Sequence, residues 1–221
     1  MSFNNIMNNR RKNWIKDQVD SWNASVPPAL QGYDMDDLLG SRWNGKISQA
    51  NVSKLKKYLK NPEKFLVLTG SSGLGKTVMG VEVCSHLLKN NMVPSALYAD
   101  TSTVLSELSF PERGDNPIAK YSRPGVLLLD DVGAFSTDMT AVRKTGLGAI
   151  INNRWLSGKY TIITTNLSPV SLDDEAGMSL KEYLGESSWD RVISSYLLIT
   201  FAGNSMRRTV PKAQRAQQRK K

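Results

Sequence analysis

Cysteine is almost absent from this sequence, and long apolar runs are absent altogether. The single cysteine, Cys84, excludes a disulfide framework within the chain, and its apolar surroundings in an expected helix favour a small core residue over a reactive thiol. No apolar run approaches the roughly 18 residues of a membrane span. The amino terminus also lacks the basic-then-apolar order of a signal peptide. We therefore expect a cytoplasmic protein that has no membrane partner.

Acidic residues are missing from the end of the chain. Residues 207–221 hold seven basic side chains and no acid, whereas the whole chain has 29 Lys and Arg against 20 Asp and Glu. Most of the formal net charge of +9 therefore lies in this tail. A basic tail is a candidate for binding a polyanion such as nucleic acid. Its composition leaves open the alternative of a solvated, disordered end.

Short apolar runs alternate with helical patterns along the rest of the chain. Five runs are typical of strands covered on both faces, and they span residues 65–68, 96–99, 126–129, 160–163 and 196–201. Helical patterns lie between them, at residues 76–89, about 139–156 and about 186–195. This repetition predicts an α/β fold with a parallel sheet and right-handed crossovers. A chain of 221 residues has room for one well-buried domain with short appendages.

A glycine-rich stretch follows the first predicted strand and opens a predicted helix. It reads GSSGLGKT and fits the pattern G-x-x-x-x-G-K-[ST] of a phosphate-binding loop. Glycines let successive backbone N–H groups point at phosphate oxygens, and the start of the helix adds a partial positive charge. Lys76 is expected to reach the β- and γ-phosphates, and the Thr77 hydroxyl to ligate Mg²⁺. A chance Gly/Ser-rich turn is the alternative. The predicted nucleotide-binding residues here are Gly70, Ser71, Ser72, Gly73, Leu74, Gly75, Lys76, Thr77 and Val78.

Polar side chains end two further predicted strands. Asp130 and Asp131 follow the run at 126–129, so they fall at the carboxyl edge of the sheet, where ligands of open α/β sheets bind. We expect Asp130 to hold the magnesium shell and Asp131 to polarise or orient an attacking water. Asn166 follows the run at 160–163 and would come near the γ-phosphate if its strand lies between the first and the third. Solvated acids and a turn-starting asparagine are the alternatives.

The motifs resemble those of a known family when they are taken together. The order of the glycine-rich loop, LLLDDVG, NNRW, TIITTNLS, LGESSWDRV and GNSMRR is similar to the AAA+ ATPases of the DnaC/DnaI helicase-loader type and their IstB relatives, over roughly residues 27–208. The resemblance implies a P-loop NTPase of the AAA+, ASCE type: an αβα sandwich with a five-stranded parallel sheet and a reduced or absent lid domain. We expect a short amphipathic segment at 1–26, an AAA+ ATPase domain at 27–206 and a basic tail at 207–221.

The resemblance also implies roles for single residues. Asn166 matches the first sensor, Arg191 the arginine finger that one subunit inserts into its neighbour's ATP site, and Arg207 the second sensor. An arginine acting between subunits would require a homo-oligomer, formed on binding ATP or DNA. A surface Asp-Arg helix pair is the alternative for Arg191, and the start of the basic tail is the alternative for Arg207. Arg154 matches a recurrent family arginine to which no role is assigned.

The function implied by the resemblance is that of an ATPase in DNA replication. Such a protein loads the hexameric replicative helicase onto single-stranded DNA in the bacterial cytoplasm, and ATP and Mg²⁺ control its binding to DNA and helicase. An origin in a phage gene would fit the short amino-terminal part. One alternative is an IstB-type transposition helper acting on duplex DNA. Another is a nucleotide switch that does not hydrolyse ATP, because Asp131 stands where many AAA+ enzymes carry Glu. Ser187 stands where some loaders have an additional Arg.

Two further segments are candidates for contacts with partners. Ile15, Val19, Trp22 and Val26 share one face of an expected helix, which would either dock in a partner's groove, with Trp22 as its anchor, or pack on its own domain. Residues 102–122 correspond to the region where related proteins insert DNA-binding elements. An ordinary surface loop is the alternative there. The candidate contacts with single strands are Phe110, Arg113, Lys120 and Tyr121.

Overall fold

One five-stranded parallel sheet forms the centre of the molecule. A computed structural model describes residues 3–40, 47–134, 139–171 and 177–206, with side chains described from residue 11 onward. Each pair of neighbouring strands runs parallel, in the order β2-β3-β4-β1-β5. The strands are β1 (Phe65–Thr69), β2 (Ala96–Asp100), β3 (Val126–Val132), β4 (Tyr160–Thr165) and β5 (Tyr196–Thr200). β4 thus lies between β1 and β3, which is the position that the sequence prediction for Asn166 required.

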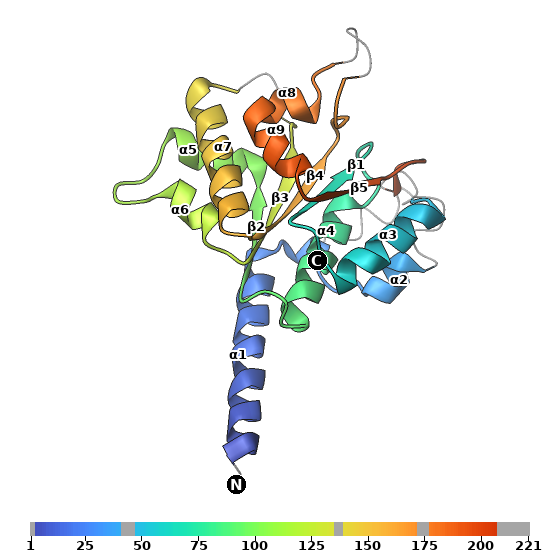
Figure 1. Ribbon diagram of the computed structural model, residues 1–221, viewed down its shortest axis with the longest axis vertical. Coiled ribbons are helices and arrows are strands. Elements are labelled where there is room, and N and C mark those ends of the chain that lie inside the picture. The colour runs from blue at the N-terminus through green and yellow to red at the C-terminus, as the bar shows by residue number, and fades with distance from the viewer. Residues whose placement is uncertain (1–2, 41–46, 135–138, 172–176, 207–221) are drawn as a thin grey trace, which may run out of the picture.

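Helices cover both faces of this sheet (Figure 1), and each face has its own core of buried apolar side chains. The helices over one face are α1 (Phe3–Ser25), the 3-10 turn η1 (Pro28–Leu30), α2 (Met35–Leu39), α3 (Gln49–Lys60) and α4 (Lys76–Lys89). Those over the other face are α5 (Thr101–Ser109), α6 (Pro117–Ser122), α7 (Ala141–Leu156), α8 (Leu180–Leu184) and α9 (Glu186–Ile193). The predicted αβα sandwich with a five-stranded parallel sheet is confirmed.

The predicted and observed bounds agree best for the helices and strands that have the strongest local sequence patterns. The five apolar runs are the five strands, and the helix predicted at 76–89 is α4. The helices expected at about 139–156 and 186–195 are α7 and α9. After β5 the described residues are 201–206, which contain no α-helix or strand. Residues 207–221, including Arg207, lie outside the described residues.

Four helices that had no counterpart in the sequence prediction share one feature. Each begins with a side chain that accepts hydrogen bonds from the first turn: Asp34 for α2, Ser48 for α3, Asp100 for α5 and Asn116 for α6. A residue of this kind at the start of a helix satisfies backbone N–H groups that have no partner within the helix. These capping residues were the sequence signal for the four helix starts. The apolar patterns that follow them were too weak to show that a helix begins there.

Helix α1 packs on the domain with its last turns and extends away from it at its start (Figure 1). Trp22 is 1% exposed, and its Nε1 donates a hydrogen bond of 3.0 Å to Ser85 Oγ in α4. Val26, just beyond the helix, is also buried. Of the two alternatives for Trp22, packing on its own domain is the one observed. No helix in the described part of the chain, not even the long and mostly polar α1, could span a membrane.

Candidate functional site

The glycine-rich loop joins β1 to α4 and has the backbone shape that its sequence predicts. Gly70 has a φ of 137°, and a Cβ atom there would lie 2.3 Å from the carbonyl oxygen of Phe201, so only glycine fits. Gly75 has a φ of 87° and precedes α4, which has no side-chain cap. The first turn of α4 therefore presents its N–H groups, and the positive end of its dipole, toward the loop.

Lys76 lies at the start of α4 with its ammonium group turned back into the loop. The side chain is 7% exposed. Its Nζ donates hydrogen bonds of 2.7 Å to Gly70 O, 2.9 Å to Ser71 O and 2.8 Å to Asn166 Oδ1. The loop and the end of β4 are thus joined through one buried cation, although 90 positions separate Lys76 from Asn166 in the sequence.

Asp130 is a buried residue of β3 and is held by the two neighbouring strands. Its Oδ1 accepts a hydrogen bond of 2.6 Å from Thr164 Oγ1 in β4, and its Oδ2 accepts one of 2.9 Å from the Tyr98 hydroxyl in β2. Burial, reinforced by the charge of Asp130 and this hydrogen bond, raises the pKa of Tyr98, so the hydroxyl keeps its proton and stays a donor. These bonds fix the orientation of the carboxylate.

Asp131 lies in a bulge of β3 that turns its side chain outward. The pairing of β3 with β4 shifts between Leu129 and Val132, and Asp131 has a φ of 56°, an uncommon conformation for a residue with a side chain. Its backbone N–H donates to Thr164 Oγ1 at 2.9 Å. Its exposed carboxylate lies 3.5 Å from Asn166 Nδ2, at the long limit of a hydrogen bond. Strained backbone of this kind is common at functional sites.

These groups surround one cavity of about 400 Å³. Its lining includes many of the predicted residues, namely Ser72, Gly73, Gly75, Lys76, Thr77, Val78, Asp130, Asp131 and Asn166. Three predicted residues of the loop, Gly70, Ser71 and Leu74, are outside the lining; Leu74 is buried beneath it. No sequence motif pointed to the other lining residues, which come from distant elements: Ala29, Leu30, Tyr33, Asp100, Thr164 and Met206. Met206 N donates to Gly73 O at 2.9 Å, and the predicted second sensor, Arg207, lies outside the described residues.

The oxygen donors of the cavity fit a magnesium ion that is shared with phosphate. The hydroxyl of Thr77 and the carboxylates of Asp130 and Asp131 are hard ligands of the kind that Mg²⁺ prefers. Within the described ranges, no three or more His, Cys, Asp or Glu side chains are grouped so that they could hold a metal. In phosphate sites Mg²⁺ takes one or two carboxylates and completes its shell with phosphate and water.

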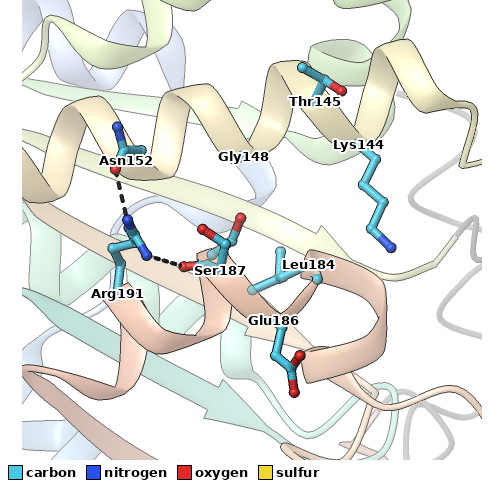
Figure 2. Close-up of a pocket in the computed structure, with 10 residues that line it drawn as sticks. Lys144, Thr145, Gly148, Asn152, Leu184, Glu186, Ser187 and Arg191 are labelled. Carbon is cyan, nitrogen blue, oxygen red and sulfur yellow. Dashed lines mark hydrogen bonds between the residues drawn. The ribbon is translucent and has the colours of Figure 1, made fainter.

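Arg191 does not line this cavity. It projects from α9 into a second hollow, of about 300 Å³, between α7 and α9 (Figure 2). Its Nε donates to Asn152 Oδ1 at 3.1 Å and its Nη1 to Ser187 O at 2.9 Å, while the guanidinium carbon lies 5.5 Å from the centre of the Trp155 ring. The structure of one chain therefore does not bring Arg191 together with Lys76, Asp131 and Asn166.

Arg154, the arginine without an assigned role, is a buried structural residue. Its guanidinium donates to Thr161 Oγ1 at 2.9 Å, to the carbonyls of Tyr121 and Pro124 at 3.1 and 2.9 Å, and to Tyr160 O. Burial lowers its pKa to about 9. It connects the segment after α6 with the start of β4, far from the cavity.

The segment between β2 and β3 presents fewer candidate DNA contacts than its sequence indicates. Tyr121 is buried, and its hydroxyl donates to Glu107 Oε2 at 2.9 Å, so its ring is not free to stack on a base. Burial and this hydrogen bond raise its pKa to about 12. Lys120 is paired with Glu107 at 2.8 Å. Phe110, which is 78% exposed, and the exposed Arg113 remain accessible.

Solved structures with this fold include proteins of DNA replication. The DnaC helicase loader superposes with a TM-score of 0.57 at 22% identity, covering 72% of this chain and 98% of DnaC. DnaI superposes with a TM-score of 0.60 at 21% identity, covering 80% and 95% of the two chains. The replication initiator DnaA bound to AMPPCP and single-stranded DNA gives 0.56 at 17% identity, covering 79% of this chain and 52% of DnaA. At these identities the likeness shows a shared P-loop AAA+ fold.

Sequence comparison identifies the family. No curated protein is similar enough to this chain to count as a match. A model of the family described as IstB-like ATP binding protein matches residues 42–214. This range includes the glycine-rich loop, Asp130, Asp131, Asn166 and Arg191, and it covers most of the chain. The chain belongs to the IstB-like ATP-binding protein family.

Proposed function

We propose that this protein is a Mg²⁺-dependent ATPase of DNA replication that loads the replicative helicase onto single-stranded DNA. ATP binding and hydrolysis would control its hold on both partners. One observation carries the catalytic part: Lys76, Asn166 and Asp131 form a chain of contacts across the carboxyl ends of β1, β4 and β3. A cation, an amide and a carboxylate in this order can hold a terminal phosphate and a water beside it.

Lys76 and Asn166 have separate proposed roles: Lys76 binds the phosphate, and Asn166 helps to orient the attacking water. Lys76 Nζ donates its three N–H groups to Gly70 O, Ser71 O and Asn166 Oδ1, so a phosphate oxygen that replaces one of the two carbonyls would receive a charge-assisted hydrogen bond. Because Asn166 Oδ1 accepts from Lys76, its amide N–H groups are left to face Asp131 and a water held between them. Asp131 then orients that water and accepts its proton as it attacks.

Thr77 and Asp130 are the proposed ligands of magnesium. The donor set fits the ion, and the orientation of Asp130 is held by Thr164 and Tyr98. Once bound there, Mg²⁺ neutralises negative charge on the phosphates. Asp130 is therefore a ligand whose rotamer is already set before the ion arrives.

Arg191 is the proposed arginine finger, acting in the cavity of a second copy. It lies outside the cavity of its own chain, which it therefore cannot complete. A guanidinium at the transferring phosphate contributes about 10³ to 10⁵ in rate. Efficient hydrolysis would thus require a homo-oligomer, formed on binding ATP or DNA. Arg207 is proposed as the second sensor, next to Met206 in the lining.

The partners are proposed from the relatives and from the charge distribution. The fold of this chain is that of the DnaC helicase loader and of DnaA bound to single-stranded DNA. We propose a hexameric replicative helicase and single-stranded DNA as its partners, in the bacterial cytoplasm. The ATPase domain would span residues 27–206, with the segment at 1–26 and the basic tail at 207–221 as appendages that contact them.

ATP turnover with different DNAs, together with capture of a replicative helicase, tests this function. The full chain should hydrolyse ATP faster with single-stranded DNA than with none, and it should retain a purified replicative helicase in the presence of ATP. The Lys76→Ala protein is the matched control, because it should lose both responses. Absence of turnover at every protein concentration would favour the non-hydrolysing switch and contradict the ATPase.

A transposition helper acting on duplex DNA is a second candidate, because the family whose model matches is described as IstB-like. The two functions predict different responses in the same assay. Stimulation of turnover by duplex DNA alone, without retention of a helicase, would reject the loader and support the helper.

A further inference from the structure

The edge of the sheet opposite the nucleotide cavity carries a row of basic residues. All strands of the parallel sheet begin at this edge, and the neighbouring strands β3, β4 and β1 are each preceded by a cation. Arg123 lies three positions before β3, Lys159 lies directly before β4, and Lys64 lies directly before β1. Because neighbouring strands are about 4.8 Å apart, these residues follow one another across the edge.

Contacts within the chain show that this basic row is continuous. Lys159 Nζ donates to Ser122 O at 2.8 Å and to Arg123 O at 2.7 Å. Lys64 Nζ lies 4.4 Å from the centre of the Tyr160 ring. Since Tyr160 follows Lys159 directly in the sequence, the three cations gather around the turn that leads from α7 into β4.

No carboxylate is paired with the basic row in the described part of the chain. None of Lys64, Arg123 and Lys159 has an ion pair there, and the buried Arg154 beside them donates only to neutral oxygens. Burial, together with the charges of Arg154 and Arg123, lowers the pKa of Lys159. The carboxylate of Glu63, next to Lys64 in the sequence, accepts a hydrogen bond of 2.6 Å from a serine hydroxyl. The edge therefore keeps an excess of positive charge.

Arg123 and Lys159 line a surface hollow of about 420 Å³ between the ends of α6 and α7. Its lining contains no acid, and its other polar residues are Ser122, Asn153 and Ser157. The hydroxyl of Ser122 is buried and has no hydrogen-bond partner among the described residues. A buried hydroxyl without a partner is costly and rare in native proteins. A ligand oxygen in the hollow would satisfy it after rotation about one side-chain bond.

The carbonyl end of α6 would repel an anion in this hollow if its oxygens were free. Arg154 and Lys159 prevent this, because together they donate hydrogen bonds to the carbonyls of residues 121–124. The two bonds of Lys159 to carbonyls leave one N–H of its ammonium group for a ligand. The hollow thus offers donors and positive charge to an anion, and the negative helix end is neutralised.

We propose that the basic row, formed by Arg123, Lys159 and Lys64, binds the phosphate backbone of single-stranded DNA, with one phosphate in the hollow beside Ser122. The proposal rests on the proposed function only for the identity of the polyanion. A small anion would occupy the hollow alone, whereas the row continues to Lys64 on a further strand, as a chain of phosphates requires. Contacts of this kind fix the path of a strand and do not read its bases.

The place of the basic row in the fold gives the contact a distinct property. The row lies at the starts of the strands, whereas Lys76, Asp130 and Asn166 lie at or beyond their ends. DNA held by the row therefore touches no residue of the nucleotide cavity. This contact should form without ATP.

DNA binding without nucleotide tests the row. In the full chain, fluorescence anisotropy with labelled oligothymidine should show about tenfold weaker binding for the double variant Arg123→Gln, Lys64→Gln. Its salt slope should be smaller by about 0.7 for each of the two lost contacts. The matched double variant Lys54→Gln, Lys56→Gln removes the same charge from exposed positions of α3 and should leave both quantities unchanged. Equal losses in the two double variants, or no binding by the unchanged chain, would overturn the row.

Amide resonances of the ¹⁵N-labelled full chain locate the contact. Titration with oligothymidine should shift the amides of Ser122, Arg123 and Lys159 until they saturate, and shifts confined to other surfaces would contradict the proposal. Two competitors separate the sources of negative charge. Equal shifts with inorganic phosphate would reduce the row to a small-anion site. Equal displacement of the DNA by poly-glutamate, at the same concentration of charge, would assign the row to an acidic protein partner instead.

The failure of this proposal and that of the ATPase function have different signatures. The double variant Arg123→Gln, Lys64→Gln keeps every residue of the nucleotide cavity, so its ATP turnover without DNA should equal that of the unchanged chain. A chain that never hydrolyses ATP, but loses DNA affinity in this variant alone, would contradict the ATPase and retain the row. A chain that hydrolyses ATP, but binds DNA equally well with and without the row, would retain the ATPase and reject the row.

Discussion

Removal of one hydroxyl, in Thr164→Val, should uncouple the Asp130 carboxylate and the Asp131 backbone N–H from β4. Thr164 is buried, and its Oγ1 makes two hydrogen bonds at once. It donates to Asp130 Oδ1 at 2.6 Å and accepts from Asp131 N at 2.9 Å. Valine has almost the same shape, so the change removes these bonds without leaving a hole.

The expected cost follows from these two bonds. A hydrogen bond to a charged group contributes about 1.5–3 kcal/mol, and a part-buried N–H left without a partner costs about 1–3 kcal/mol. Some of the second cost is relieved by water at the exposed bulge. We expect the free energy of unfolding to fall by about 2–4 kcal/mol. Because Asp130 is the proposed magnesium ligand, loss of its supporting bond should also lower ATP turnover roughly 10–100-fold and raise the Mg²⁺ requirement.

Thr161→Val is the matched control on the same strand. Thr161 is equally buried, but its Oγ1 accepts from Arg154 Nε at 2.9 Å, at the other end of β4. It should lose a similar free energy of unfolding, about 1.5–3 kcal/mol, and keep its turnover. Urea unfolding measures the stability of both variants, and ATP turnover over a range of Mg²⁺ concentrations, well below their unfolding temperatures, measures function.

The comparison between the two variants can refute the reasoning. Normal turnover and normal Mg²⁺ dependence in Thr164→Val would mean that Asp130 does not need this bond, and its role as a preset ligand would be wrong. Equal losses of turnover in both variants would attribute the effect to stability alone.

Three other changes have defined outcomes. Lys76→Ala should weaken ATP binding at least tenfold, by about 1.4 kcal/mol or more, whereas Lys60→Ala should not; unchanged affinity, measured with a fluorescent ATP analogue, would contradict the phosphate-loop assignment. Trp22→Ala should cost about 3–5 kcal/mol of unfolding free energy, and Trp14→Ala, at a side chain that is 40% exposed, should cost about 0.5 kcal/mol or less; equal losses in chemical denaturation would contradict the observed packing. Deletion of residues 209–221 should lower DNA affinity and reduce its salt slope by about 0.7 for each lost contact with a single strand, and an unchanged slope would show that the tail does not touch DNA.

The strands, the main helices between them and the central part of the site could be predicted from the sequence. The apolar runs, the helical periods and the glycine-rich loop are patterns of residues that are close together in the sequence, so α4 was predicted with its observed bounds. The predicted parallel order brings the strand ends together, because it places the carboxyl ends of neighbouring strands at one edge of the sheet. Asp130, Asp131 and Asn166 therefore could be expected near Lys76 before any contact was known.

The partner of each side chain could be learned only from the packed fold. Lys76 bonds to Asn166 across 90 positions, and Trp22 bonds to Ser85 across 63. The support of Asp130 by Tyr98 and Thr164 has no motif, since it depends on which strands are neighbours in the sheet. The same is true of the buried role of Arg154. Contacts of this kind arise from the packing of whole elements, which a pattern of a few residues does not encode.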